Sequence, residues 1–167
     1  MQKLSAGEFK NVIKNTPLVS VDLIIRNSSD QVLLGLRTNA PAKNMWFVPG
    51  GRISKNESLA EAFKRISKAE TGIEISHESG LFMGIYEHLY PGENFANDPG
   101  FGTHYIVMAF SVPLNLKTEN LPKLQHVSYK WFTEKEILSN YKIHQNTKNY
   151  FNGFTPFNQQ ANGLIRN

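Results

Sequence analysis

The sequence predicts one α/β or α+β domain built from strands mixed with a few helices. Short runs rich in β-branched and aliphatic residues alternate with segments of helical periodicity, and Gly, Pro, Asn and Asp mark the turns between them. With 167 residues, of which 40% are hydrophobic, the chain is long enough for one core and too short to expect two. We expect the domain to span residues 1–155 and a loosely ordered tail to follow over 156–167.

The first elements are predicted from a capping box and two strand-like runs. Ser5 and Glu8 have the spacing of a capping box, and the apolar residues behind them share one helical face, so a short helix should end before Pro17. Residues 18–26 and 31–36 are rich in aliphatic and β-branched side chains, and a polar turn cluster separates them. We therefore predict a leading helix followed by a β-hairpin.

The middle of the chain combines a broken strand with a second capped helix. An apolar run that begins at Trp46 is interrupted by Pro49 and two glycines, which ends a strand there. Ser58 and Glu61 form another capping-box pattern, so a helix should begin at this point.

Three further strands are predicted. Residues 80–89 and 103–112 have strand composition, and the Gly-, Pro- and Asn-rich loop between them is long enough to act as a lid or binding loop. A last strand should cover 127–132, and a capped helix should follow over 134–138.

Composition excludes several classes of function. Zero cysteines exclude disulfides, thiolate metal sites and a cysteine nucleophile, so any metal must have oxygen ligands. The N-terminus lacks the apolar core of a signal peptide and no apolar run could span a membrane, so we expect a cytoplasmic protein without a membrane partner. The net charge of +4 comes from scattered Lys and Arg, which favours a solvated basic surface or a small phosphorylated ligand over nucleic acid.

A motif between residues 51 and 73 is the most specific signal in the chain. It resembles the Nudix box, G-x5-E-x7-R-E-U-x-E-E-x-G-U, in which U is a bulky aliphatic residue. The matching positions are Gly51, Glu57, Arg65, Glu70, Gly72 and Ile73. The departures are Ile66 and Ala69, where the pattern has glutamate, and Ser67, where it has an aliphatic residue. Six fixed residue types at fixed offsets rarely coincide by chance.

The resemblance to the Nudix family implies a mixed central β-sheet sandwiched between helices. In this family the box forms a loop, a helix and a loop, and its glutamates hold divalent cations on a diphosphate. Only Glu70 remains of the three carboxylates at the end of the box, which is adequate for a single Mg²⁺ together with a backbone carbonyl and the substrate's phosphates. Glu57 is interpreted as a loop anchor, whereas Arg52 and Arg65 are expected to contact phosphate.

A closer resemblance extends from Phe9 to Tyr150. Six segments are similar to the GDP-mannose mannosyl hydrolases, an atypical branch of the Nudix family with the same shortened box: residues 16–22, 33–42, 46–52, 62–70, 103–105 and 125–126. The resemblance implies a homodimer that hydrolyses GDP-mannose, or a related GDP-hexose, to GDP and free sugar. Water would attack the anomeric carbon with inversion, with Mg²⁺ as the cofactor.

The family's roles are carried over by position. The resemblance implies Mg²⁺ ligands at Gly50, Glu70 and Gln125, a general base at His126, diphosphate contacts from Arg52, Arg65 and Tyr105, and sugar contacts from Asp22, Arg37 and His88. Imidazole has a pKa near neutrality, which suits a general base.

Each of these residues also has a purely structural interpretation. A lone histidine before a strand, such as His126, is usually exposed, and His88 at the end of an apolar strand could be a satisfied interior histidine. Tyr105 alternates with apolar neighbours and could belong to the core, and Asp22 could lie at an exposed strand position. Two other functions stay open: a conventional Nudix pyrophosphohydrolase that cleaves P–O bonds of a nucleoside diphosphate compound, and a non-catalytic module that binds a nucleotide sugar.

Overall fold

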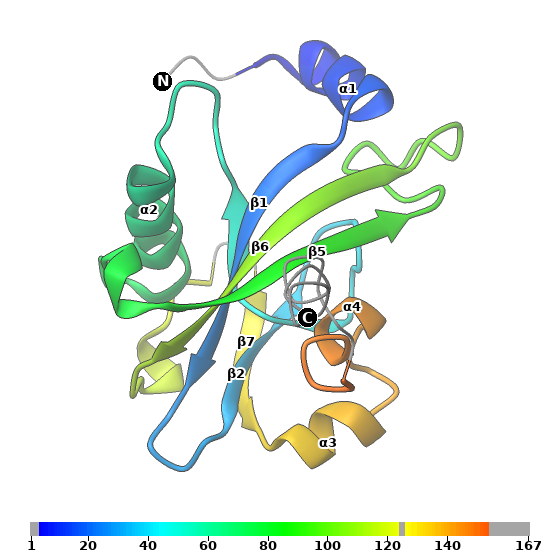
Figure 1. Ribbon diagram of the computed structural model, residues 1–167. Coiled ribbons are helices and arrows are strands. Elements are labelled where there is room, and N and C mark those ends of the chain that lie inside the picture. The colour runs from blue at the N-terminus through cyan, green and yellow to red at the C-terminus, as the bar shows by residue number, and fades with distance from the viewer. Residues whose placement is uncertain (1–3, 124–125, 154–167) are drawn as a thin grey trace, which may run out of the picture.

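The computed structural model describes residues 4–123 and 126–153 (Figure 1). The tail predicted over 156–167 lies outside the described residues. Helix α1 (Ala6–Asn15) begins at a capping box in which Ser5 and Glu8 exchange side-chain and backbone hydrogen bonds, as the sequence predicts. In the described ranges, no helix has the length and apolar character needed to cross a membrane.

The strands of the described chain form one mixed sheet. Their bounds are β1 (Leu18–Arg26), β2 (Val32–Arg37), β3 (Trp46–Phe47), β4 (Gly50–Arg52), β5 (Leu81–Tyr90), β6 (Thr103–Pro113) and β7 (His126–Phe132). The order is β3-β2-β1-β6-β5, with β4 paired to β1 and β7 paired to β2. The β1–β6 pair is parallel and the other pairs between these strands are antiparallel, so the predicted mixed sheet is confirmed.

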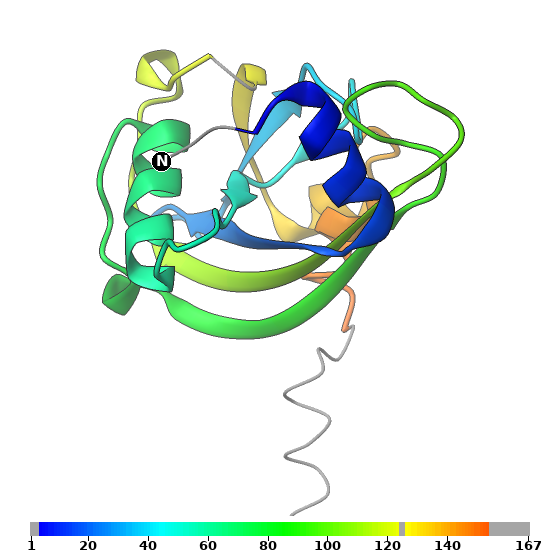
Figure 2. The same ribbon diagram turned by 90° about the horizontal axis from the view of Figure 1, so that it is seen from above.

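Helices cover both faces of the sheet, with α2 on one side and α3 and α4 on the other (Figures 1 and 2). Their bounds are α2 (Leu59–Thr71), α3 (Glu134–Ser139) and α4 (Gln145–Lys148), with short 3-10 turns at His77–Ser79 and Thr118–Asn120. Helix α2 begins at the predicted capping box of Ser58 and Glu61, and ends at Gly72 in the left-handed conformation. It buries Phe63 and Ile66 against β1 and β6.

The strands separate near the middle of β1, and this opening makes room for polar side chains. On one edge β1 pairs with β6 along its whole length, from Leu18 to Arg26. On the other edge it pairs with β4 over residues 20–22 and meets β2 only at Arg26 and Val32. Residues 23–25, between these two contacts, have no ladder to β2. Asp22 lies at the edge of this gap, in the last residue pair with β4.

Candidate active site

Five buried polar side chains from separate parts of the chain gather where β1 and β2 diverge. We call them the buried polar cluster: Asp22, Glu70, His88, His126 and Tyr150, each at most 7% exposed. They come from β1, α2, β5, β7 and the segment after α4. Buried ionisable groups are costly unless they are paired or functional, so such a cluster is the strongest candidate for an active site.

His126 is held by one ring nitrogen, and its other nitrogen has no hydrogen-bond partner among the described residues. Its Nδ1 lies 3.2 Å from the Tyr129 hydroxyl and 3.3 Å from Glu70 Oε2. The Tyr129 hydroxyl donates its proton to the Pro122 carbonyl at 2.9 Å, so its oxygen accepts from Nδ1–H of His126. In its neutral form the imidazole therefore presents an unprotonated Nε2, as a general base requires. Of the two interpretations of His126, the exposed one is excluded, because the residue is 1% exposed.

Asp22 and His88 are joined through Tyr150. The Tyr150 hydroxyl donates to Asp22 Oδ2 at 2.7 Å and lies 3.2 Å from His88 Nε2. Burial raises the pKa of Asp22 to about 7; the Tyr150 hydrogen bond and Arg37 oppose this rise, whereas Glu70 adds to it. Burial, assisted by His144, lowers the pKa of His88 to about 3, so His88 is neutral at physiological pH.

Two glycines make the close approach of these side chains possible. A Cβ atom at Gly35 would collide with the imidazole of His126, and one at Gly50 would collide with the carboxylate of Asp22. Gly35 lies on β2 opposite β7, and Gly50 on β4 opposite Asp22 itself. Both positions therefore exclude a side chain for packing reasons.

An open pocket of about 440 Å³ lies beside the cluster, and arginines are among the residues that line it. Arg37, Arg52 and Tyr105 line it, together with Phe9 of α1 and Phe95 of the loop between β5 and β6. The Phe9 and Phe95 rings are 4.9 Å apart, and the Arg52 guanidinium lies 3.8 Å from the centroid of the Phe9 ring. The pocket thus combines cations with aromatic faces, which suits a phosphorylated ligand that carries a ring.

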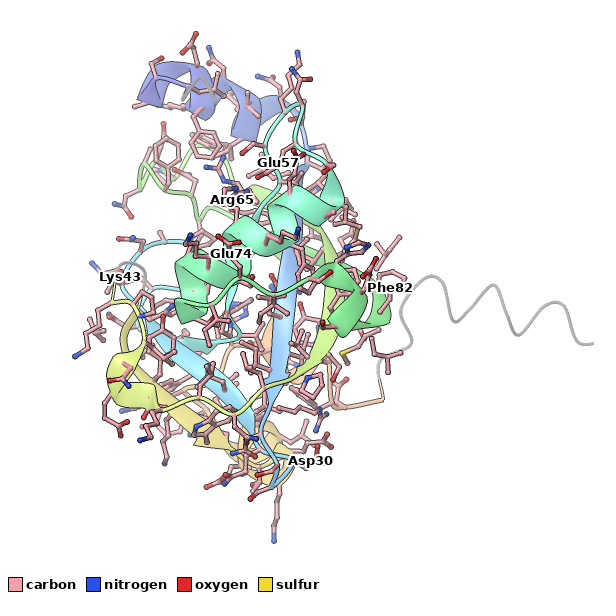
Figure 3. All side chains as sticks on the ribbon, turned by 90° about the vertical axis from the view of Figure 1, so that its left-hand side faces the viewer. Asp30, Lys43, Glu57, Arg65, Glu74 and Phe82 are labelled. Atoms are coloured by element: carbon pink, nitrogen blue, oxygen red, sulfur yellow. The ribbon has the colours of Figure 1, made fainter. Side chains whose placement is uncertain are left out.

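Arg65 does not line this pocket, because Glu57 holds its guanidinium (Figure 3). Its Nε and Nη2 contact both carboxylate oxygens of Glu57 at 2.5 and 2.7 Å, and Nη2 also donates to the Arg52 carbonyl at 2.8 Å. Glu57 accepts in addition from the Ser54 backbone. These contacts fix the loop before α2, so Glu57 anchors the loop. A phosphate contact by Arg65 stays a prediction.

The structure describes two of the three predicted metal ligands. The Glu70 carboxylate is buried, and Gly50 pairs with Asp22 at the same opening of the sheet, whereas Gln125 lies outside the described residues. No group of three or more His, Cys, Asp or Glu among residues 4–123 and 126–153 is arranged to hold a metal ion. The two predicted ligands that the structure describes would offer a carboxylate and a backbone carbonyl, and they lie beside the buried Asp22 carboxylate, whose pKa is raised partly by Glu70. Such oxygen donors fit Mg²⁺, which keeps few protein ligands.

Comparison with known proteins decides the family. The model of the NUDIX domain matches residues 16–153 of this chain. The chain belongs to the Nudix hydrolase family. Among its relatives is the low-salt glycan biosynthesis protein Agl8 of Haloferax volcanii, which is 41% identical over 113 residues, covering 68% of this chain and 69% of the relative.

Solved structures confirm the fold of this Nudix hydrolase. The MutT protein of Methanosarcina mazei superposes with a TM-score of 0.66 at 20% identity, covering 91% of this chain and 99% of that one. The NUDIX domain of Shewanella oneidensis NrtR, solved with ADP-ribose, gives a TM-score of 0.55 at 15% identity, covering 97% and 100% of the two chains. Nudix hydrolases generally use divalent metals such as Mg²⁺ and bind nucleotide derivatives.

The two positions where the Nudix box has lost a glutamate, Ile66 and Ala69, differ in their burial, which leads to a stability prediction. Ile66 is 1% exposed in the core under α2, whereas Ala69 is exposed on the same helix. We expect Ile66→Glu to lower the free energy of unfolding by roughly 3–5 kcal/mol, because it buries an uncompensated charge. Ala69→Glu should change it by less than about 0.5 kcal/mol. Urea denaturation measures both, and equal effects would contradict the assigned burial.

The raised pKa of Asp22 in this Nudix hydrolase predicts a pH-dependent stability. The folded-state value of about 7 lies above the ordinary 3.8, so Asp22 stabilises the fold fully below about pH 4 and loses this contribution as pH rises through 7. Asp22→Asn cannot ionise, so in metal-free buffer we expect it to be more stable than the natural protein by about 2–4 kcal/mol at pH 8. At pH 4 the difference should nearly vanish.

The control for this prediction is Asp30→Asn, which removes a carboxylate whose side chain is 78% exposed in a turn (Figure 3). Urea denaturation at pH 4, 5.5 and 8 gives the comparison. A gain for Asp22→Asn that does not depend on pH would show that Asp22 is ionised without cost in the fold.

Sequence reasoning missed three residues of the Nudix site: Gly35, Tyr129 and Tyr150. Gly35 interrupts a strand pattern, which is a recognisable signal of close approach. Tyr129 lies three residues after His126, but nothing in the sequence shows that its hydroxyl turns back toward the imidazole. Tyr150 lies in a polar segment, and its contact with Asp22 spans 128 positions. No local pattern could have revealed it.

Proposed function

We propose that the protein hydrolyses a GDP-hexose, GDP-mannose above all, to GDP and free sugar by attack of water at the anomeric carbon with inversion. The observation that carries this proposal is His126, a buried imidazole on β7 with an unprotonated Nε2 directed away from the Glu70–Tyr129 contact. Attack at carbon needs a base beside the sugar. Because the Nudix box of this chain has lost two carboxylates, we assign the base to a residue outside the box.

His126 takes the proton from water at Nε2. Glu70 Oε2, 3.3 Å from Nδ1, stabilises the imidazolium that then forms, and the Tyr129 oxygen fixes the ring orientation. A base that is oriented by a second, charged group is a general arrangement in enzyme active sites.

Asp22 and His88 face the sugar. A carboxylate stabilises positive charge that develops on the sugar ring as its bond to the diphosphate breaks. Asp22 can supply that charge, and Arg37 beside it favours the ionised form. His88, neutral and buried, is suited to a hydrogen bond with a sugar hydroxyl.

The pocket beside the cluster takes the nucleotide. Arg37, Arg52 and Tyr105 contact the diphosphate, and the Phe9 and Phe95 rings provide aromatic faces for the base. Glu70, Gly50 and Gln125 would hold Mg²⁺, which would supply positive charge to stabilise the departing GDP. Because GDP leaves as an anion that needs no proton, cations replace the general acid of an ordinary glycosidase. The name of the relative from Haloferax volcanii, a glycan biosynthesis protein, supports a sugar-containing substrate.

The test is a panel of GDP-mannose, GDP-glucose and GDP-fucose with Mg²⁺, followed by separate assays for free sugar and for GDP. Free sugar and GDP in equal amounts support the proposal. Formation of GMP and a sugar phosphate would identify a conventional pyrophosphohydrolase. Binding of GDP-mannose without Mg²⁺-dependent turnover would identify a non-catalytic nucleotide-sugar module.

A further inference from the structure

The Tyr150 side chain contacts both Asp22 and His88. It lies in the segment after α4 and is 7% exposed. Its hydroxyl oxygen is 2.7 Å from Asp22 Oδ2 and 3.2 Å from His88 Nε2. It therefore joins the two side chains that face the sugar in the proposed function.

When Asp22 is ionised, the two hydrogen bonds have a fixed direction. A phenol has one proton, and Tyr150 donates it to the Asp22 carboxylate. Burial next to Asp22 raises the pKa of Tyr150 well above its ordinary value, so this proton stays on the phenol. The second contact must then be donated by His88, from Nε2–H to the Tyr150 oxygen. His88 is thereby held in the Nε2–H tautomer, opposite to the Nδ1–H tautomer of His126.

The Tyr150 ring cannot easily turn away from this position. It packs edge-on against Tyr86 at 4.7 Å between centroids, and Tyr86 lies two residues before His88 on the same face of β5. The chain before Tyr150 is tied to β3, because Trp46 donates its backbone N–H to Lys142 at 2.9 Å and accepts from His144 at 3.2 Å. The hydroxyl is thus fixed relative to β1 and β5 together.

We propose that Tyr150 is a positioning residue of the active site, which orients the Asp22 carboxylate and the His88 imidazole toward the sugar of the substrate. The inference rests on the proposed function for the identity of the substrate. A tyrosine that only filled the core would need its ring and not its hydroxyl. Tyr150→Phe separates the two roles, because it keeps the ring.

The kinetic test compares Tyr150→Phe with the natural protein and with Tyr141→Phe, a control at an 81% exposed position. We expect kcat for the GDP-hexose to fall about 10- to 100-fold in Tyr150→Phe, as for loss of a hydrogen bond to a charged group, while the Kd for GDP, which lacks the hexose, stays within about twofold. In an Asp22→Ala background the same substitution should lower kcat by a clearly smaller factor, because only the contact with His88 is then left to lose. Unchanged kcat, or equal losses in both backgrounds, would overturn the positioning role.

A second measurement does not depend on turnover. The ¹⁵N NMR spectrum of the histidine rings at pH 8.5, with the His88 signals assigned from a His88→Gln variant, should show His88 as the Nε2–H tautomer in the natural protein. Tyr150→Phe should shift its Nε2 resonance. An Nδ1–H tautomer at His88 in the natural protein would overturn the inference. The expected tautomer in a protein that hydrolyses no GDP-sugar would refute the proposed function while leaving the directed contact intact.

Discussion

Replacement of His126 by glutamine is expected to lower kcat for GDP-mannose by about 10²–10⁴-fold with little change in substrate binding, the effect of losing a general base. Glutamine keeps a polar group of similar reach beside Glu70 and Tyr129, but it cannot accept a proton from water. The measurement is steady-state kinetics at saturating Mg²⁺, together with the Kd for GDP-mannose in the variant.

The control is His77→Gln, which changes a histidine in the 3-10 turn after α2, outside the buried polar cluster. It should keep the natural kcat. Because His126 is buried, thermal unfolding of His126→Gln must accompany the kinetics. A folded variant with unchanged kcat would remove His126 from the mechanism.

The second large effect is expected for Glu70→Gln. Glu70 is proposed both to stabilise the His126 imidazolium, across 3.3 Å, and to hold Mg²⁺, so the substitution removes a charge from two roles. We expect kcat/KM to fall by at least about 10²-fold and the Mg²⁺ concentration for half-maximal activity to rise.

Glu74→Gln provides the matched control, because Glu74 is an exposed glutamate four residues further on that pairs with Lys68 (Figure 3). Its Mg²⁺ titration should match that of the natural protein. The same titration for Glu70→Gln, with kcat alone reduced, would show that Glu70 serves His126 and not the metal.

Local signals in the sequence predicted the helices well. The capping boxes at Ser5, Ser58 and Thr133 form as expected, because each depends on hydrogen bonds between residues three positions apart. Helix α4 was missed. It has four residues, and its N-cap is His144 and not the usual Ser, Thr, Asp or Asn.

Contacts between distant parts of the chain could not be predicted in the same way. The parallel pairing of β1 with β6 joins residues 87 positions apart, such as Leu18 and Tyr105, and it follows from how the sheet assembles and not from either strand's composition. The burial of His126 depends on Gly35 and Glu70, which reach it from β2 and α2. The resemblance pointed to His126, whereas local sequence alone favoured an exposed histidine.

The candidate site was therefore predicted in outline. Asp22, Glu70, His88 and His126 do come together, and Arg37, Arg52 and Tyr105 line one pocket. The sequence could not show that Arg65 is held by Glu57, because the motif fixes both residues without saying that they contact each other. Nor could it show that the Tyr150 hydroxyl, 128 positions along the chain, contacts Asp22.

The central claim is that water attacks carbon and not phosphorus, and the position of an oxygen label tests it most directly. The protein is incubated with GDP-mannose and Mg²⁺ in H₂¹⁸O, and the products are analysed by mass spectrometry. We predict that ¹⁸O appears in the free sugar and that GDP carries none. Label in a phosphate-containing product would contradict the account.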